Sequence, residues 1–315
     1  MISAVIITAR GGNFLSACIN SLRIQTHRVD NIIVVHSFPC IHKQKDIQYI
    51  STKGYLGYAH AVNCGLQKVD TPFFMVLNDD TILHRTCIKE LIAHLHPYRI
   101  LQPQIRQLDQ PQLIENTGHW ITKDGFNLAR GRGEHYQTVF PTSIMVFSGA
   151  AFCAPRTIWK EIGPMDEDLF SFGEDLDWSL RAIRAGYAIR YVCDSVVYHK
   201  LSGTHDTAGF HKGRWVERNR ICAVLRSWPK SLILSSPYYT ATRLFHMLQS
   251  SLNHKGLAKD ALYTTAIGAL VGYCQASTHI SRAIEKRKSD QKNWRCDDVE
   301  FLDMIERNLP PLHAL

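Results

Sequence analysis

The sequence lacks the long apolar run that a membrane-spanning helix needs, because no window approaches roughly 18 to 20 uninterrupted apolar residues. The apolar stretch at residues 4–7 has no basic leader and is too short for a signal sequence. The nine cysteines are odd in number, scattered, and never spaced as C-x-x-C, which argues against a disulfide framework or a zinc site. We therefore expect a cytoplasmic protein with reduced, mostly buried thiols.

The sequence also lacks internal repeats, low-complexity tracts and the dinucleotide fingerprint G-x-G-x-x-G. What it has is 315 residues, 45% of them hydrophobic and 20% charged, which is ample for a large core. This composition favours one α/β domain with an appended helical part. The segment 53–58 has two glycines that allow close backbone approach to a ligand and two tyrosines that could face a ring.

The net charge of +8 is concentrated in one stretch. Residues 200–259 hold ten Lys and Arg against two Asp and Glu, whereas the rest of the chain is nearly balanced. A basic patch attracts phosphates, nucleic acid or an anionic membrane surface. The ordinary alternative is a solvated helical face, and the charge count alone does not separate the two.

The first hundred residues alternate between short apolar strands and helices. Strands are expected at 4–8, 32–35 and 72–77. Helices are expected at 14–24 and 86–95, together with a short helix that follows the turn at 53–57 and ends at residue 66. This alternation predicts a parallel, doubly wound sheet, whose ligands bind at the carboxyl ends of the strands. Thr8, His36 and the segment 78–80 lie at those ends.

The second half is less regular. Irregular strands are expected over 103–141, with a mobile loop at 124–135, and further strands at 143–152, 189–192 and 195–198. Helices are expected at 155–162 and 174–185, and beyond Gly213, with breaks at Pro229, Pro237 and 254–256.

Asn78, Asp79 and Asp80 leave a buried strand directly into solvent. Adjacent carboxylates repel each other unless a cation lies between them, although an Asx turn is the common alternative. His199 ends a later strand at a comparable position, which makes it the best candidate for a nitrogen ligand to the same cation. A lone histidine is more often structural.

Glu174 and Asp175 begin a helix, where acidic residues also gain from the helix dipole. They follow Phe170-Ser171-Phe172-Gly173, an aromatic approach typical of a ligand cleft. A carboxylate there could deprotonate an attacking hydroxyl. Farther on, Arg214, Arg218 and Arg220 are spaced to put at least two guanidinium groups on one helical face, where they suit phosphate oxygens.

The combination of motifs resembles the family 2 inverting glycosyltransferases of the GT-A fold, particularly the rhamnosyl- and galactofuranosyl-transferase-like branch. The matching segments follow one another in the family's order from about Ala4 to Arg220. They are 5–8 (VIIT), 20–26 (NSLRIQT), 57–65 (GYAHAVNCG), 77–81 (LNDDT), 148–150 (SGA), 163–167 (GPMDE), 173–181 (GEDLDWSLR), 197–199 (VYH) and 218–220 (RNR). Two positions depart from the pattern, because His36 replaces a nucleotide-contacting Asp and Arg10 replaces an Asn.

The resemblance implies a Rossmann-like, mainly parallel sheet flanked by helices in residues 1–212, with a nucleotide-sugar half at 1–102 and an acceptor half at 103–212. Residues 213–315 would form a C-terminal helical region. It implies a Mn²⁺ or Mg²⁺ site at Asp80, His199 and Asn78, and a catalytic base at Asp175 beside Glu174. The nucleotide-binding residues would be Thr8, Arg10, His36, Lys53, Gly57, Asn63 and Asp79. The acceptor and diphosphate residues would be Gly149, Ala150, Phe172, Trp178, Arg214 and Arg218.

The implied reaction moves a sugar from a UDP- or dTDP-linked donor to a glycan or lipid-diphosphate acceptor, as in bacterial surface polysaccharide synthesis. The basic stretch could then touch the inner membrane surface, the helical tail could form a homodimer, and no nucleic acid would be bound. Two alternatives stay open at this point. One is a sugar-1-phosphate nucleotidyltransferase, and the other is a non-catalytic protein that binds nucleotide sugars on the same fold.

Overall fold

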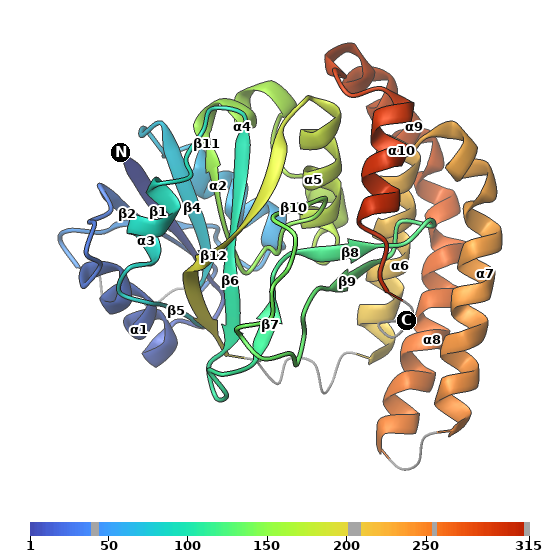
Figure 1. Cartoon of the computed structure of the whole chain (residues 1–315), viewed down its shortest axis with the longest axis horizontal. Coiled ribbons are helices and arrows are strands. Elements are labelled where there is room, and N and C mark those ends of the chain that lie inside the picture. The colour runs from blue at the N-terminus through green and yellow to red at the C-terminus, as the bar shows by residue number, and fades with distance from the viewer. Residues whose placement is uncertain (39–43, 201–208, 254–256, 312–315) are drawn as a thin grey trace.

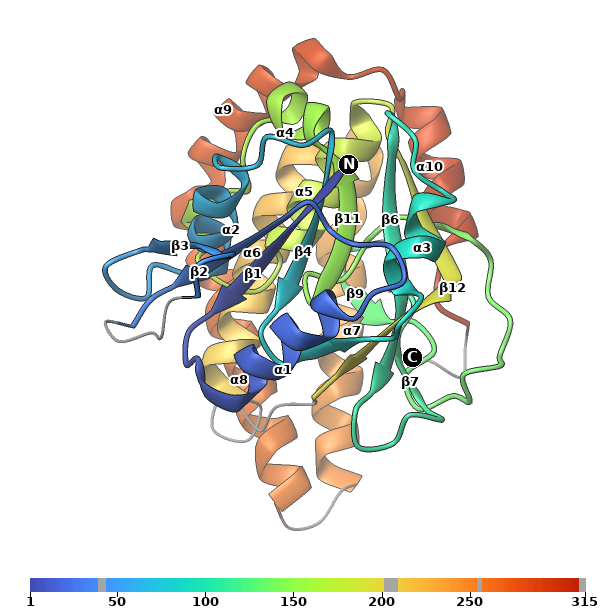
Figure 2. The ribbon, with the colours of Figure 1, turned by 90° about the vertical axis from the view of Figure 1, so that its left-hand side faces the viewer.

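The computed structural model describes residues 1–38, 44–200, 209–253 and 257–311. Its centre is a mixed sheet whose strands run in the order β10-β12-β6-β11-β4-β1-β2-β3 (Figures 1 and 2). The bounds of these strands are β1 Ile2–Thr8, β2 Asn31–His36, β3 Gln48–Ser51, β4 Phe73–Asn78, β6 Arg99–Gln107, β10 Ser143–Ile144, β11 Ala151–Pro155 and β12 Ala188–His199.

The sheet is largely parallel. Strands β4, β1, β2 and β3 run parallel to one another, as do β6 and β12, whereas β11 lies antiparallel between β4 and β6. Short strands β5 (Thr81–Leu83) and β7 (Ile114–Asn116) pair with β12 and β6, and β8 (His119–Ile121) forms a separate hairpin with β9 (Asn127–Ala129). The predicted α/β fold with a mainly parallel sheet is confirmed.

Helices cover both faces of the sheet because its strands alternate their apolar side chains between two cores. In β1, Ala4 and Ile6 pack on α1 (Gly12–Arg23) and α3 (Cys87–Ile92), whereas Val5 faces the opposite core. That second core also contains side chains of α2 (Tyr58–Leu66), α4 (Arg156–Ile162) and α5 (Glu174–Arg184).

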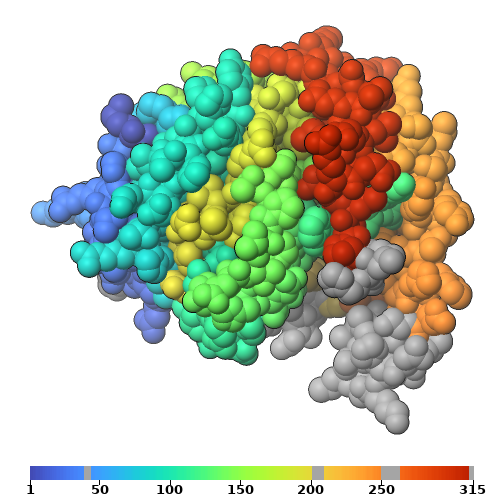
Figure 3. All heavy atoms as spheres, in the orientation of Figure 1, coloured from blue at the N-terminus to red at the C-terminus, as the bar shows by residue number. Residues whose placement is uncertain are grey.

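The C-terminal helices form a layer beside α5 (Figure 1), and Figure 3 shows the orange and red helices packed against the green and yellow segments. They are α6 Gly209–Ser227, α7 Lys230–Asn253, α8 Leu257–Ala276, α9 Ile280–Asp290 and α10 Asp298–Arg307. Helices α6 and α8 approach with backbones in contact, since a Cβ at Gly268 would collide with the Phe210 carbonyl oxygen. None of the described helices combines the length and apolar character needed to cross a bilayer.

Several predicted boundaries are wrong. The apolar run 143–152 is two strands joined by a crossing segment, because β10 pairs with β12 whereas β11 pairs with β4. The strands expected at 189–192 and 195–198 are one strand, β12, with a bulge between Val192 and Val196. Helix α7 continues through Pro237, although the break near Pro229 is confirmed. The break expected at 254–256 lies outside the described residues.

The loop expected to be mobile at 124–135 is instead held by buried charges. Asp124 is 1% exposed and accepts hydrogen bonds from Thr240 Oγ1 and Arg243 Nε at 3.1 and 2.9 Å. Arg220 Nη1 donates to the Asp124 carbonyl oxygen, and both arginines pair with the buried Glu217. These ion pairs connect the 124–135 segment to α6 and α7.

The basic stretch is therefore a smaller surface patch than its charge count suggests. Arg220, Arg226 and Arg243 are largely buried in ion pairs with carboxylates of the protein. Lys200 pairs with Asp109 at 2.6 Å. The three arginines neutralise buried or partly buried acids and Lys200 pairs with a surface acid, which leaves less free positive charge for an anionic surface.

Candidate functional site

A pocket of about 720 Å³ lies at the carboxyl ends of β1 and β4. These strand ends point toward the lower half of Figure 2. Residues far apart in the sequence line it together, among them Asp80, Asp175 and His199. Most of the other predicted site residues also line it. They are the predicted nucleotide-binding and acceptor residues Thr8, Arg10, His36, Gly57, Asp79, Gly149, Ala150 and Phe172, the predicted metal ligand Asn78, and Glu174 beside the predicted base.

One side of the pocket holds a carboxylate–histidine–carboxylate row. The Nδ1 atom of His199 lies 2.9 Å from both carboxylate oxygens of Glu115, and its Nε2 atom lies 3.0 Å from Asp80 Oδ1. All three side chains are at most 17% exposed. Burial lowers the pKa of His199, but the two carboxylates outweigh burial and raise that pKa to about 10.

The facing atoms of this row fit a bound cation. Asp80 Oδ1 and His199 Nε2 are both buried, and neither makes a well-aligned hydrogen bond to any described residue. A carboxylate and an imidazole nitrogen are both ligands of Mn²⁺-like ions, and Glu115 fixes the ring as an outer-shell carboxylate does. Among the described residues no group of three His, Cys, Asp or Glu converges on one point, so a cation here would need further ligands from a substrate.

Beside this row, Asp79 is fixed at the end of β4. It accepts a hydrogen bond from Thr8 Oγ1, which in turn accepts one from the Gly11 backbone N–H at 2.8 Å. Burial raises the pKa of Asp79 above its ordinary value, although the hydrogen bond from Thr8 and the charge of Arg10 oppose that shift. The chain thus places two acids and a guanidinium around one strand exit, where a phosphate-bearing ligand and its counter-ion can both be held.

Asp175 stands at the start of α5, across the pocket from this strand exit. Its Oδ2 accepts a hydrogen bond from the Gly149 N–H at 3.2 Å, and its Oδ1 accepts one from the Leu176 N–H at 2.8 Å. The Tyr58 hydroxyl donates to the Gly149 carbonyl oxygen, which fixes this segment from the other side. Asp175 is half-buried, so one carboxylate is both oriented and reachable from the pocket.

Its neighbour Glu174 is 7% exposed, and its Oε2 atom has no hydrogen-bond partner among the described residues. Burial, and then the charge of Asp175, raise the pKa of Glu174 to about 8. At neutral pH Glu174 is therefore mostly protonated.

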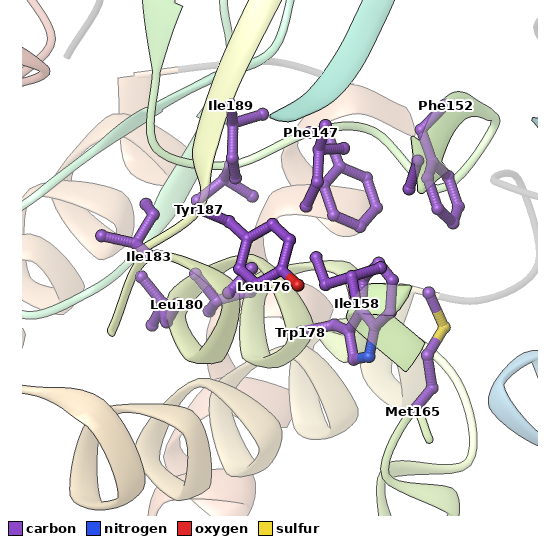
Figure 4. Close-up of a cluster of buried hydrophobic side chains, with 14 of the residues drawn as sticks. Phe147, Phe152, Ile158, Met165, Leu176, Trp178, Leu180, Ile183, Tyr187 and Ile189 are labelled. Atoms are coloured by element: carbon purple, nitrogen blue, oxygen red, sulfur yellow. The ribbon is translucent and has the colours of Figure 1, made fainter. Parts of the chain in front are cut away.

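Five predicted site residues do not line this pocket. Trp178 is fully buried, lies among Ile158, Met165 and other core side chains (Figure 4), and donates its indole N–H to Gly163 O at 3.1 Å. Trp178 belongs to the core because it lies on the face of α5 that packs inward, whereas Glu174, the first residue of α5, lines the pocket. Lys53 is exposed outside the pocket.

The other three, Asn63, Arg218 and Arg214, lie outside the pocket and contact other parts of the protein. Asn63 bonds the backbone of Met165 and the Glu167 carboxylate, and so ties α2 to the segment before α5. Arg218 donates to the carbonyl oxygens of Asp168 and Leu169. The Arg214 guanidinium lies 5.9 Å from the Trp215 ring centroid.

The pocket also contains residues that the sequence did not single out. The sequence around Glu115 has no clear strand pattern. Only the contact with His199 in the structure indicates that Glu115 belongs to the site. His119 is half-buried, lines the pocket, and lies close enough to Asp175 to feel its charge. Arg132 and Lys212 bring positive charge to the side opposite β4, and Lys212 could have been found in the basic stretch.

Comparison with known proteins agrees with this geometry. The sequence profile of the family described as glycosyltransferase-like family 2 matches residues 17–217, which is more than half of the chain. The chain belongs to this family. The matched region contains the strand exit at 78–80, the start of α5, and His199.

Two bacterial relatives with similar sequences carry out different reactions, as their names indicate. A pre-mycofactocin glycosyltransferase of Mycobacterium tuberculosis is 27% identical over 158 residues, which cover 49% of this chain and 32% of the relative. A teichoic acid poly(glycerol phosphate) polymerase of Staphylococcus epidermidis is 24% identical over 153 residues, 42% of this chain and 21% of the relative. This family 2 chain thus spans about a third or less of each relative's length.

Solved structures share the fold over nearly the whole chain. GalNAc-T7 with UDP, GalNAc and Mn²⁺ aligns with a TM-score of 0.59 at 14% identity, covering 90% of this chain and 57% of that one. The mannosyltransferase PcManGT of Pyrobaculum calidifontis, with GDP-Man and Mn²⁺, gives 0.54 at 12% identity over 92% and 86%. Residues 1–349 of S. aureus TarS give 0.52 at 16% identity over 96% and 91%. At these identities the likeness shows the GT-A fold alone.

Proposed function

We propose that this family 2 chain transfers a sugar from a nucleoside-diphosphate donor to a hydroxyl of an acceptor, with inversion at the anomeric carbon. The observation that carries the proposal is the meeting of Asp175 with the Asp80–His199 pair in one pocket. Membership of a glycosyltransferase family favours glycosyl transfer over the nucleotidyltransferase alternative. The finer placement in the rhamnosyl- and galactofuranosyl-transferase-like branch stays a prediction.

The donor would occupy the half of the pocket formed by β1 and β4. Thr8, Arg10 and His36 line the part next to β2, where a nucleoside would lie, and Asp79 and Asp80 lie where its diphosphate would end. Asp80 and His199, with Asn78 beside them, would hold Mn²⁺ or Mg²⁺. When bound, such a cation supplies Lewis-acid stabilisation of the departing diphosphate. Solved relatives of the fold contain Mn²⁺ together with UDP or GDP-Man.

Asp175 would take the proton from the acceptor hydroxyl as the oxygen attacks the anomeric carbon. Two features suit it to this role. The Gly149 N–H holds one carboxylate oxygen in place, and the half-buried side chain lines the pocket, where an acceptor hydroxyl can reach it. The attack breaks the bond to the diphosphate in the same displacement, so the configuration inverts. The acceptor would be a glycan or a lipid-linked diphosphate.

The first experiment measures nucleotide binding. The melting temperature of the protein is recorded with UDP, dTDP and GDP, each with and without Mn²⁺. We expect UDP or dTDP to raise it, and Mn²⁺ to increase the rise. If no nucleoside diphosphate shifts the melting temperature under either condition, the proposal fails.

The second experiment tests the base. Asp175→Asn should lower the rate of sugar transfer by about 10²- to 10⁴-fold, because an amide cannot accept the proton, while nucleotide binding persists. Asp168→Asn is the matched control, since Asp168 is 40% exposed, lies outside the pocket, and undergoes the same chemical change. Transfer at the wild-type rate by the Asp175 variant would assign the base to another residue.

A further inference from the structure

The segment that leads into the candidate base has an unusual backbone. Phe170 and Phe172 have φ angles of 63° and 66°, in the left-handed region that bulky side chains rarely adopt. The only other described non-glycine residue with positive φ is Lys53. Two aromatic residues in this conformation, one residue apart, are strained, and such strain persists only where the surroundings impose it.

Helix α6 imposes it through one buried side chain. Asn219 is fully buried, and its amide nitrogen donates to the carbonyl oxygens of Leu169, Ser171 and Phe172. On the other side, the Tyr58 N–H donates to the Phe170 carbonyl oxygen at 2.9 Å. The loop is thus held at both edges, which makes Asn219 a positioning residue for whatever the loop presents.

The two phenylalanines of the strained loop join a ring from the segment before α2 and one from α6 in a row of aromatic rings, and two of the four rings line the pocket. Phe170 meets Tyr55 edge-on at 5.4 Å between centroids and lies 5.6 Å from Trp215. Trp215 in turn stacks on Phe172 at 6.3 Å, with 27° between the ring planes. We call Tyr55, Phe170, Phe172 and Trp215 the aromatic row. Tyr55 and Phe172 line the pocket, and Tyr55 is 56% exposed.

We propose that the aromatic row is the binding platform for a sugar ring of the acceptor. A pyranose has a face of C–H bonds that packs on the electron-rich face of an aromatic ring, while its hydroxyls remain free to react. Phe172 is three residues before Asp175, so a sugar on this platform brings its hydroxyl toward the candidate base. The inference rests on the proposed function and names its acceptor class, which is a saccharide.

Burial in a core is the simpler explanation for an aromatic cluster, but it does not suit this one. Phe170, Phe172 and Trp215 are only partly buried, although the chain has many fully buried apolar side chains nearby. A core contact also does not require the left-handed backbone, which opposes folding at both phenylalanines. The Lys212 ammonium lies 5.8 Å from the Phe172 ring, so the platform also has a polar neighbour for ring oxygens or an attached phosphate.

The test uses saturation-transfer NMR on the full chain with UDP and Mg²⁺, which is diamagnetic and does not broaden the ligand signals. The probes are the methyl β-glycosides of glucose, galactose and N-acetylglucosamine. We expect saturation of aromatic protons to reach the C–H protons of at least one glycoside. Phe172→Leu, which keeps an apolar side chain without a ring, should weaken that binding about 3- to 10-fold. Phe245→Ala, at a 63% exposed ring on α7, is the control and should leave it unchanged.

Phe172→Gly separates binding from a structural role. Glycine adopts a positive φ without strain, so we expect this variant to keep most of the wild-type melting temperature while losing glycoside binding. Failure of all three glycosides to receive saturation, or equal binding by the wild type and both Phe172 variants, would overturn the inference. UDP binding measured in the same samples distinguishes this from failure of the proposed function, since a protein that binds no UDP fails the earlier proposal instead.

Discussion

Replacing Glu174 by glutamine should remove a loss of unfolding free energy that the wild type undergoes as the pH rises. The folded state raises the pKa of Glu174 from 4.5 to about 8, because the carboxylate would be buried beside Asp175. Between these two values the unfolded chain releases the proton, whereas the folded chain retains it. Ionisation therefore stabilises only the unfolded state, and the unfolding free energy of the wild type falls as pH rises from 4.5 to 8.

The magnitude follows from the size of the shift. Each pKa unit corresponds to about 1.4 kcal/mol, so a shift of this size could remove as much as about 4 to 5 kcal/mol between pH 4.5 and pH 8. Relaxation around the ionised group reduces that figure, and about 2 to 4 kcal/mol is a realistic expectation. The amide of the Glu174→Gln variant does not titrate, so the variant does not undergo this loss.

The assay is urea unfolding followed by tryptophan fluorescence at pH 5, 6.5 and 8. Any constant effect of the new amide cancels, because only the change with pH of the difference between variant and wild type is used. That difference should grow in favour of Glu174→Gln. Glu285→Gln, at an exposed carboxylate on α9, controls for the substitution itself. A difference that stays flat from pH 5 to pH 8 would refute the argument that Glu174 is protonated in the folded protein.

Three further predictions follow from the ion pairs. Glu115→Gln should raise the Mn²⁺ concentration needed for half-maximal thermal stabilisation about 10- to 100-fold, because His199 loses its orienting carboxylate. An unchanged midpoint concentration would show that Glu115 does not support the cation site. Asp124→Ala should cost about 3 to 5 kcal/mol of unfolding free energy, measured in urea, because it leaves Arg243 and Arg220 short of a buried acid; a loss below about 1 kcal/mol would contradict the burial of this network. Co-sedimentation with anionic vesicles tests the predicted membrane contact. Because four basic side chains of the stretch are paired within the protein, we expect only weak retention at low salt, abolished by high salt; no retention at low salt would end that prediction.

The strand exits could be predicted from the sequence because the signal is local. The apolar run 73–77 ends abruptly in Asn78, Asp79 and Asp80, and a buried strand that stops in acids must place them at the edge of the sheet. The same holds for Thr8 after β1 and for His199 after β12. Parallel pairing of β4 with β1, and of β12 with β6, then brings these ends to one side of the molecule.

Other features depend on contacts between distant segments and leave no local signal. Residues 143–152 show one apolar pattern, yet their two ends pair with different strands. Pro237 usually interrupts a helix, but α7 continues because its inner face is held by Arg243 and by packing on α8. Glu115 illustrates the same point within the site, since nothing in residues 110–119 reveals that this carboxylate meets His199.

The R-N-R segment shows how much a charge pattern depends on where it is placed. As a sequence it suggested phosphate-binding arginines, yet Arg218 and Asn219 bond backbone carbonyls of 168–172, and Arg220 neutralises buried acids. The bonds made by Asn219 hold the strained loop that ends at Asp175. Helix α6 therefore helps to build the candidate pocket, and the predicted boundary after residue 212 falls inside this helix. A truncation that removed α6 would release the loop and, with it, the position of the candidate base.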